Sequence, residues 1–146
     1  MINKKLIASD IISAALLLLF LYTAINKIID HGIFKDALSQ TPHLQHFAAT
    51  IAWLLPVIEI GVSILLFIPS TRLKGLYASF ILLILLTVYL IYMVLFAPTL
   101  PCNCGGVIQQ LSWVQHIFFN LFFILLSVAG IYLARRRNRP LSTAPT

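Results

Sequence analysis

The chain has 146 residues, of which 60% are hydrophobic and only 10% are charged, and its formal net charge is +6. This composition, with a mean hydropathy of +0.98, excludes an ordinary soluble domain and predicts an integral membrane protein. The positive charge does not indicate nucleic-acid binding, because the basic residues cluster at the edges of apolar runs and form no soluble basic face.

Four apolar runs are each close to the roughly 20 residues that an α-helix needs to cross hydrocarbon. They are Leu6–Ile25, Ile51–Ile68, Leu73–Phe96 and Ser112–Leu133. We therefore expect an all-α polytopic membrane protein, a bundle of four transmembrane helices that forms one domain over residues 1–134.

The first run follows Lys4 and Lys5 and so resembles a secretory signal. However, Asp10 interrupts its start, and residues 22–24 make a poor cleavage site, so we expect an uncleaved helix. The loop after it carries apolar residues at helical spacing, with polar residues on the other faces. The apolar ones are Ile33, Phe34, Ala37 and Leu38. This pattern predicts a short amphipathic helix in the membrane interface.

Most of the basic residues lie on one side of the predicted membrane. Eight of the ten are in the two terminal segments and the second loop, whereas the first loop has only Lys27 and Lys35 and the third has none. Both termini are therefore expected in the cytoplasm of a multi-pass protein of the bacterial inner membrane, with the first and third loops outside. The basic tail 135–146 is expected to be disordered and to contact anionic membrane lipids.

Cys102 and Cys104 are the only cysteines, and they lie in the uncharged third loop. On the outer side of the membrane they meet an oxidising compartment. A disulfide between them closes a small ring near the geometric limit, and strained disulfides are the easily reduced, catalytic or regulatory ones. The alternative is a static disulfide or two unreactive thiols, but a disulfide that closes so short a loop adds little stability. No metal is predicted, because one Cys-x-Cys supplies only half of a tetrahedral site.

The fourth run begins directly after this cysteine loop. Ser112 fits its N-cap, with Gln115 as the capping-box partner, and the positive end of the helix dipole favours a nearby thiolate. His116 and Asn120 follow on one face of the same helix. His116 is a candidate proton shuttle for a thiol, and its alternative role is packing against a neighbouring helix.

Glu59 is the only acidic residue well inside the apolar runs, which makes it a functional candidate. Its depth is close to that of Asn120, so we predict a hydrogen bond from Asn120 or His116 to Glu59. Pro56, one turn earlier, is expected to kink the second helix. Either proton handling or a structural clasp explains this polar spot. Lys27, at the end of the first run, either snorkels to the headgroups or stabilises a thiolate.

These residues together resemble the MauE branch of the DoxX-like membrane proteins, over nearly the whole chain. The resemblance is carried by a first helix ending in Lys27, an amphipathic loop, Leu55-Pro56 with Glu59 and Gly61, and Cys102-Asn103-Cys104-Gly105-Gly106 before the last run. Gly106 stands at a position where many proteins of this kind have another residue. The resemblance implies a redox-associated four-helix membrane protein that works with a thioredoxin-like partner in maturing the disulfide-rich small subunit of methylamine dehydrogenase. It implies a role in extracytoplasmic thiol–disulfide traffic without requiring methylamine metabolism.

The leading hypothesis is a membrane carrier or helper that exchanges disulfides with a thioredoxin-fold partner outside the cytoplasm, at most as a thiol–disulfide oxidoreductase acting with that partner. One dithiol does not relay electrons between two partners alone, so a quinone or a second protein must supply or accept them. No sequence pattern indicates a cofactor or identifies a quinone site. The alternatives are a non-catalytic assembly factor and a small-solute transporter with Glu59 and His116 as coupling groups.

Overall fold

A computed structural model describes residues 4–96 and 113–138. The helices of this part are α1 (Lys4–Ile29), α2 (His31–Ser39), the 3₁₀ helix η1 (Gln45–Phe47), α3 (Ala48–Phe67), α4 (Arg72–Phe96) and α5 (Trp113–Arg137). The described residues form no strand, and α1, α3, α4 and α5 are long and apolar enough to cross a membrane. The predicted all-α, four-span fold class is confirmed.

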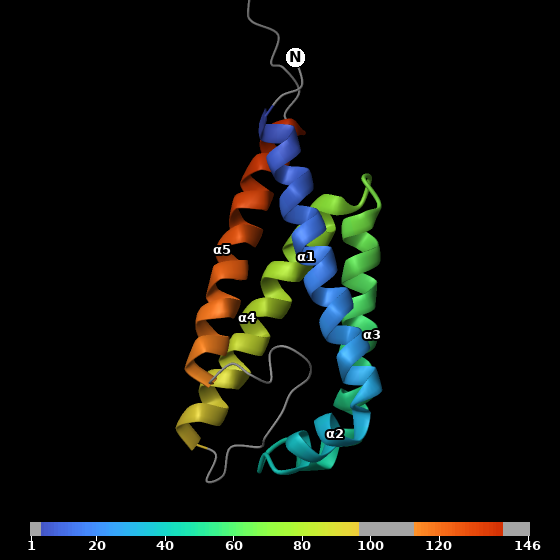
Figure 1. Ribbon diagram of the computed structural model, residues 1–146, viewed down its shortest axis with the longest axis vertical. Helices are drawn as coiled ribbons and strands as arrows, with labels where there is room; N and C mark the ends of the chain where they lie inside the picture. Colours follow the sequence, from blue (N-terminus) through green and yellow to red (C-terminus); the bar gives the residue numbers. More distant parts are fainter. Residues whose placement is uncertain (1–3, 97–112, 139–146) are drawn as a thin grey trace, which may run out of the picture.

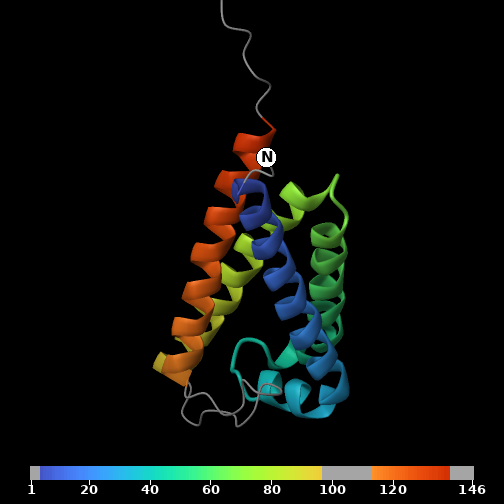
Figure 2. The ribbon, with the colours of Figure 1, turned by 45° about the horizontal axis from the view of Figure 1, so that its top comes forward.

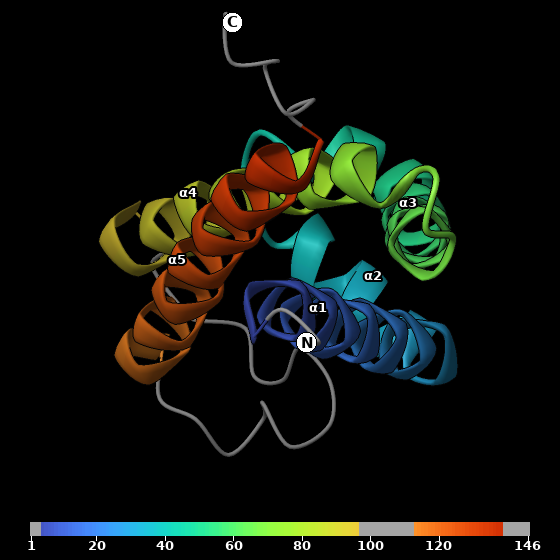
Figure 3. The same ribbon diagram turned by 90° about the horizontal axis from the view of Figure 1, so that it is seen from above.

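The four long helices form an open bundle with two distinct ends. α1 and α4 cross on opposite sides of the bundle, and α3 and α5 flank them (Figures 1 and 3). α1 packs mainly on α3 and α5, and α4 on α5 and α3. We call the end with α2, Phe96 and Trp113 the loop end. The other, with Lys4, the turn 68–71 and Arg137, is the terminal end (Figure 2).

The long helices extend beyond the apolar runs that predict them. α1 continues to Ile29, four residues past the predicted end, and α5 continues to Arg137. Residues 135–137, assigned to a disordered tail from the sequence, are therefore helical. Hydrophobicity marks the part of a helix that suits hydrocarbon, whereas backbone hydrogen bonding continues past it into the interface. The extension of α1 brings Lys27 inside a helix.

The turn between α3 and α4 is set by Pro69. Ile68 has ψ of 120°, which is extended backbone, because a residue before proline is driven out of the helical region. The free carbonyls at the end of α3 are capped by the next residues. The Thr71 hydroxyl donates to Leu65 O at 3.0 Å, and Arg72 Nε donates to Leu66 O at 3.3 Å. From the sequence, residues 69–72 predict a tight turn between these two helices, because Pro69 cannot extend an ideal helix. The structure has this turn, with Arg72 as the first residue of α4.

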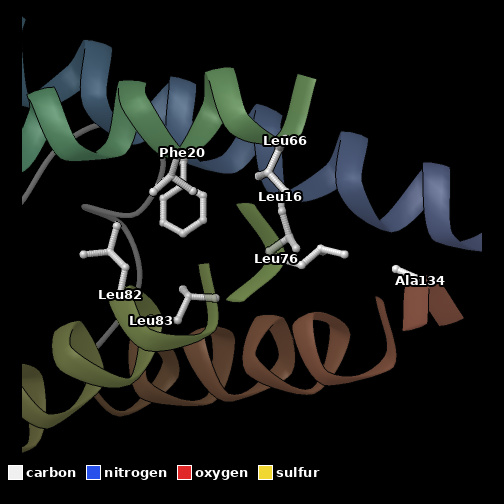
Figure 4. Close-up of a cluster of buried hydrophobic side chains, with 8 residues drawn as sticks. Leu16, Phe20, Leu66, Leu76, Leu82, Leu83 and Ala134 are labelled. Atoms are coloured by element: carbon white, nitrogen blue, oxygen red, sulfur yellow. The ribbon is translucent and has the colours of Figure 1, made fainter. Parts of the chain in front are cut away.

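The apolar core lies between the long helices and holds Leu16 and Phe20 of α1, Leu66 of α3, and Leu76 and Leu83 of α4, all at most 2% exposed (Figure 4). On α1 the buried residues follow a spacing of three or four, namely Ser9, Ser13, Leu16, Phe20 and Ala24. One stripe of each helix therefore faces the bundle, while many large apolar side chains face outward, as a lipid environment requires.

At Gly75 the backbone of α4 lies close to the end of α3. A Cβ added there would lie 2.9 Å from the Leu66 backbone nitrogen, whereas one added at Gly61 has no atom within 4 Å. We expect Gly75→Ala to lower the free energy of unfolding by about 1–3 kcal/mol, because the backbone must move apart. Gly61→Ala is the matched control and should be neutral or slightly stabilising. Thermal unfolding in detergent measures both, and equal stability of the two variants contradicts the close approach.

Asp10, which interrupts the first apolar run, joins three helices at the terminal end. Its carboxylate accepts a hydrogen bond from Arg72 at the start of α4 and lies 4.0 Å from the guanidinium Nη1 of Arg137 at the end of α5. The side chain is 52% exposed, so solvent screens these pairs. Asp10 therefore orients the helix ends more than it stabilises them.

The predicted amphipathic helix is present as α2, but its apolar face is covered by protein. Phe34 and Leu38 pack with Ala48 and Ala52 of α3, while Ile33 is 46% exposed. α2 thus closes the loop end of the bundle instead of resting its whole apolar face on lipid (Figure 1).

Candidate functional site

A cavity of about 510 Å³ lies in the half of the bundle nearest the loop end. All five α-helices contribute to its wall, which is mostly leucine, isoleucine and phenylalanine. Among the wall residues with a polar group are Thr23 and Lys27 of α1, Glu59 of α3, Tyr89 of α4, and His116 and Asn120 of α5. An apolar cavity with a few convergent polar groups is the usual form of a small-molecule site.

The central feature of the cavity is an ion pair between α1 and α3. Lys27 Nζ donates to Glu59 Oε1 at 2.8 Å, and the two side chains are only 12% and 1% exposed. The Lys27 ammonium also lies 5.8 Å from the centre of the Phe34 ring of α2. A buried charge is tolerated only when it is paired, so the presence of each residue accounts for the burial of the other.

The pair leaves half of the carboxylate unsatisfied. Glu59 Oε2 is buried, and no residue within 4–96 or 113–138 forms a hydrogen bond with it. Thr23 lies beside the Glu59 carboxyl in the cavity wall, one turn before Lys27, and its hydroxyl donates to Phe20 O at 3.2 Å. Since buried polar atoms in native proteins are almost always bonded, Oε2 marks a place where a donor is missing.

The predicted hydrogen bond from Asn120 or His116 to Glu59 is wrong in its partner. Glu59 is bonded to Lys27 instead, and neither Asn120 nor His116 donates to its second oxygen. His116 and Asn120 nevertheless line the same cavity as Glu59, from α5. Asn120 is 6% exposed and His116 is half-buried.

The role of Lys27 was missed because the first apolar run stops at Ile25, which places Lys27 in the headgroups. The structure instead continues α1 to Ile29 and turns Lys27 inward, so snorkelling is not its role here. A pattern in the sequence does point this way. Lys27 follows Phe20 and Ala24 by seven and three residues, which continues the buried stripe of α1.

On α3 the site is built on a similar stripe. Ala52, Pro56, Glu59 and Ser63 are buried at spacings of three or four, and the helix continues through Pro56 without interruption. The Ser63 hydroxyl donates to Glu59 O at 2.9 Å. Pro56 removes one backbone donor just before Glu59. The structure therefore places Pro56 and Glu59 on the same face of α3, turned toward the bundle.

Three predicted site residues lie outside the described residues, namely Cys102, Cys104 and Ser112. The residues that flank their segment are Phe96, where α4 ends, and Trp113, where α5 begins, and both are at the loop end. His116 is therefore three residues into α5, on the same side of the bundle as these two helix ends.

Chemically, this arrangement offers a mostly apolar cavity with an ammonium held by an ion pair, a carboxylate oxygen that can accept from a donor, an imidazole and an amide. Ionisable groups at membrane depth are costly and usually functional. Together they can bind a small polar group within apolar surroundings, and a proton can be passed between the imidazole and such a group.

Comparison with known proteins identifies one family. Residues 5–133 match the family described as methylamine utilisation protein MauE, which is nearly the whole chain. No curated protein and no solved structure matches.

Proposed function

Since this chain belongs to the MauE family, we propose that it takes part in thiol–disulfide exchange outside the cytoplasm of a bacterial inner membrane, with Cys102 and Cys104 as the reacting pair. Its partner is a thioredoxin-fold protein, and the exchange contributes to maturing a disulfide-containing client. The family name connects the family with methylamine utilisation, and the proposed chemistry does not depend on that pathway.

The observation that carries the proposal is the collection of ionisable groups at one end of the bundle. The Lys27–Glu59 pair and His116 line a cavity in the half of the bundle where α4 ends and α5 begins, and these ends flank the cysteine segment in the sequence. The positive-inside rule supports an outward orientation of this end, because the terminal end carries Lys4, Lys5, Arg72 and Arg135–Arg137.

The exchange proceeds through a mixed disulfide. One thiolate of the pair attacks a disulfide sulfur of the partner, which forms a new S–S bond and releases a partner thiolate. The second cysteine then attacks the mixed disulfide, closes the Cys102–Cys104 bond and releases the dithiol partner. Two electrons pass from this chain to the partner, and the reverse sequence returns them.

Trapping of the mixed disulfide tests this proposal. We expect one of Cys102→Ser and Cys104→Ser to accumulate a dithiothreitol-sensitive adduct in membranes quenched with N-ethylmaleimide, because the resolving thiol is missing. Mass spectrometry should identify a thioredoxin-fold protein joined through its own active-site cysteine. The double variant Cys102→Ser/Cys104→Ser is the control and should form no adduct.

The competing function is a non-catalytic assembly factor. It predicts that both single variants and the double variant support client maturation as well as the wild type and trap no partner. That result, measured as the yield of correctly disulfide-bonded client, would sink the exchange proposal.

A further inference from the structure

The unsatisfied Glu59 Oε2 and the apolar cavity around it point to a ligand. We propose that the cavity binds a lipid-soluble hydroquinone, whose hydroxyl donates to Glu59 Oε2, and that the hydroquinone–quinone couple exchanges electrons with the cysteine pair. The binding site rests on the cavity residues alone, whereas the electron exchange rests on the proposed function.

The ligand must bring a hydrogen-bond donor. In its ion pair with Lys27, Glu59 is a carboxylate, which only accepts hydrogen bonds. Its Oε1 accepts from Lys27 at 2.8 Å, and its buried Oε2 has no partner in the part of the chain that the structure describes. A ligand hydroxyl placed at Oε2 satisfies it with a charge-assisted bond, which is among the strongest that a neutral donor forms.

The rest of the ligand must be apolar, and it must come from the membrane. The cavity volume of about 510 Å³ falls within the roughly 300–1,000 Å³ of small-molecule sites. Ile58 of α3 and Leu85 of α4 line the cavity, yet they are 41% and 61% exposed on the lipid-facing surface. α3 and α4 diverge from their shared turn toward this level (Figures 1 and 2). Such a rim suits a ring in the cavity and a hydrocarbon tail in the bilayer.

The polar groups stand at two sides of the cavity, as a ring with two opposite oxygens requires. The Lys27–Glu59 pair lies between α1 and α3, whereas His116 and Asn120 come from α5, across the bundle from α3 (Figure 3). A hydroquinone has one hydroxyl for each side. A fatty acid or a phospholipid brings a charged head, which fits Glu59 and the apolar wall less well.

A quinone also completes the electron balance of the proposed exchange. In the reverse sequence the partner's dithiol reduces the Cys102–Cys104 disulfide, and the quinone then oxidises the two thiols again. This oxidation breaks two S–H bonds and forms one S–S bond, releasing two electrons and two protons. Reduction of the quinone takes up the same two electrons and two protons and forms two O–H bonds. Because only the hydroquinone has a donor for Oε2, the site should bind it more tightly than the quinone.

Binding is tested on the full-length Cys102→Ser/Cys104→Ser protein in nanodiscs, so that no thiol takes part. Titration with decylubiquinol should give saturable binding, and decylubiquinone or the di-O-methyl ether of the quinol should bind at least about tenfold more weakly. Glu59→Gln should abolish this preference for the hydroquinone. Equal binding of all three compounds, or retention of phospholipid alone, overturns the proposal.

A second pair of variants guards against misfolding of Glu59→Gln. Ile58→Trp places bulk at the cavity rim and should reduce decylubiquinol affinity at least about tenfold, with an unchanged thermal unfolding midpoint. Ile64→Trp, on a 54% exposed position of the same helix outside the cavity wall, is the matched control and should bind normally. Unaltered binding in Ile58→Trp contradicts the site.

The outcome separates this inference from the proposed function. If the cysteine-free protein binds decylubiquinol but neither single cysteine variant traps a partner, the ligand site stands and the exchange with a protein partner fails. If a partner is trapped but no quinol binds, the exchange stands and a second protein must carry the electrons.

Discussion

Replacing Lys27 with methionine should lower the free energy of unfolding by about 3 kcal/mol or more, because it leaves Glu59 as a buried and unpaired charge. The carboxylate is 1% exposed, so water reaches it little, and Lys27 is the hydrogen-bond donor that it has among the described residues. The loss should appear as a lower midpoint in thermal or SDS unfolding of the protein in mixed micelles.

A double variant distinguishes the loss of the Lys27–Glu59 attraction from the cost of leaving the Glu59 charge buried without a partner. Lys27→Met/Glu59→Leu removes both charges, and we expect its stability to return to near that of the wild type, because an apolar pair of similar volume replaces a buried ion pair at little cost. Asp10→Asn is the matched control at the terminal end. Its 52% exposed carboxylate should contribute only about 0–1 kcal/mol. If Lys27→Met and Asp10→Asn cost the same, the buried character of the Lys27–Glu59 pair is contradicted.

Phe20→Ala should destabilise the bundle by about 3 kcal/mol or more through the void that it leaves. The ring is 1% exposed, belongs to the apolar core and also forms part of the cavity wall (Figure 4). In a membrane the loss comes mainly from packing contacts, since lipid is as apolar as the side chain itself. Unfolding in mixed micelles measures it.

Phe118→Ala is the control for this prediction. Phe118 is 66% exposed on α5 and does not line the cavity, so lipid or detergent replaces the ring at little cost, and we expect less than about 1 kcal/mol. Similar losses in the two variants would mean that Phe20 is not packed as described.

The two strongly predicted effects concern the same region for different reasons. Phe20 holds α1 in the core by contact area, and Lys27, seven residues later on the same stripe, holds it to α3 by charge. A bundle stabilised by packing alone has no need of the second interaction. The buried pair, with one carboxylate oxygen lacking a partner among the described residues, is the feature on which the proposed ligand site depends.

Glu59, His116 and Asn120 were found from the sequence because polar side chains are rare in apolar runs, and their depth followed from helical rise. The sequence did not show that Lys27 is the partner of Glu59. The depth of a residue along its helix does not say how that helix is rotated about its axis relative to its neighbours. This rotation places Glu59 against Lys27 and leaves Asn120 on another part of the cavity wall. The helix ends predicted from the sequence were too early for a related reason, since the apolar runs end before the helices do.

The sequence by itself determined the membrane class, the four spans, the turn at Pro69 and the positions of the intramembrane polar residues, because each depends on local hydrophobicity or backbone restriction. Only the tertiary structure decided that Lys27 pairs with Glu59, that α2 packs its apolar face on α3, and that five helices enclose one cavity. These features depend on how helices cross and rotate against one another. Such packing is the sum of many weak contacts between residues far apart in the chain.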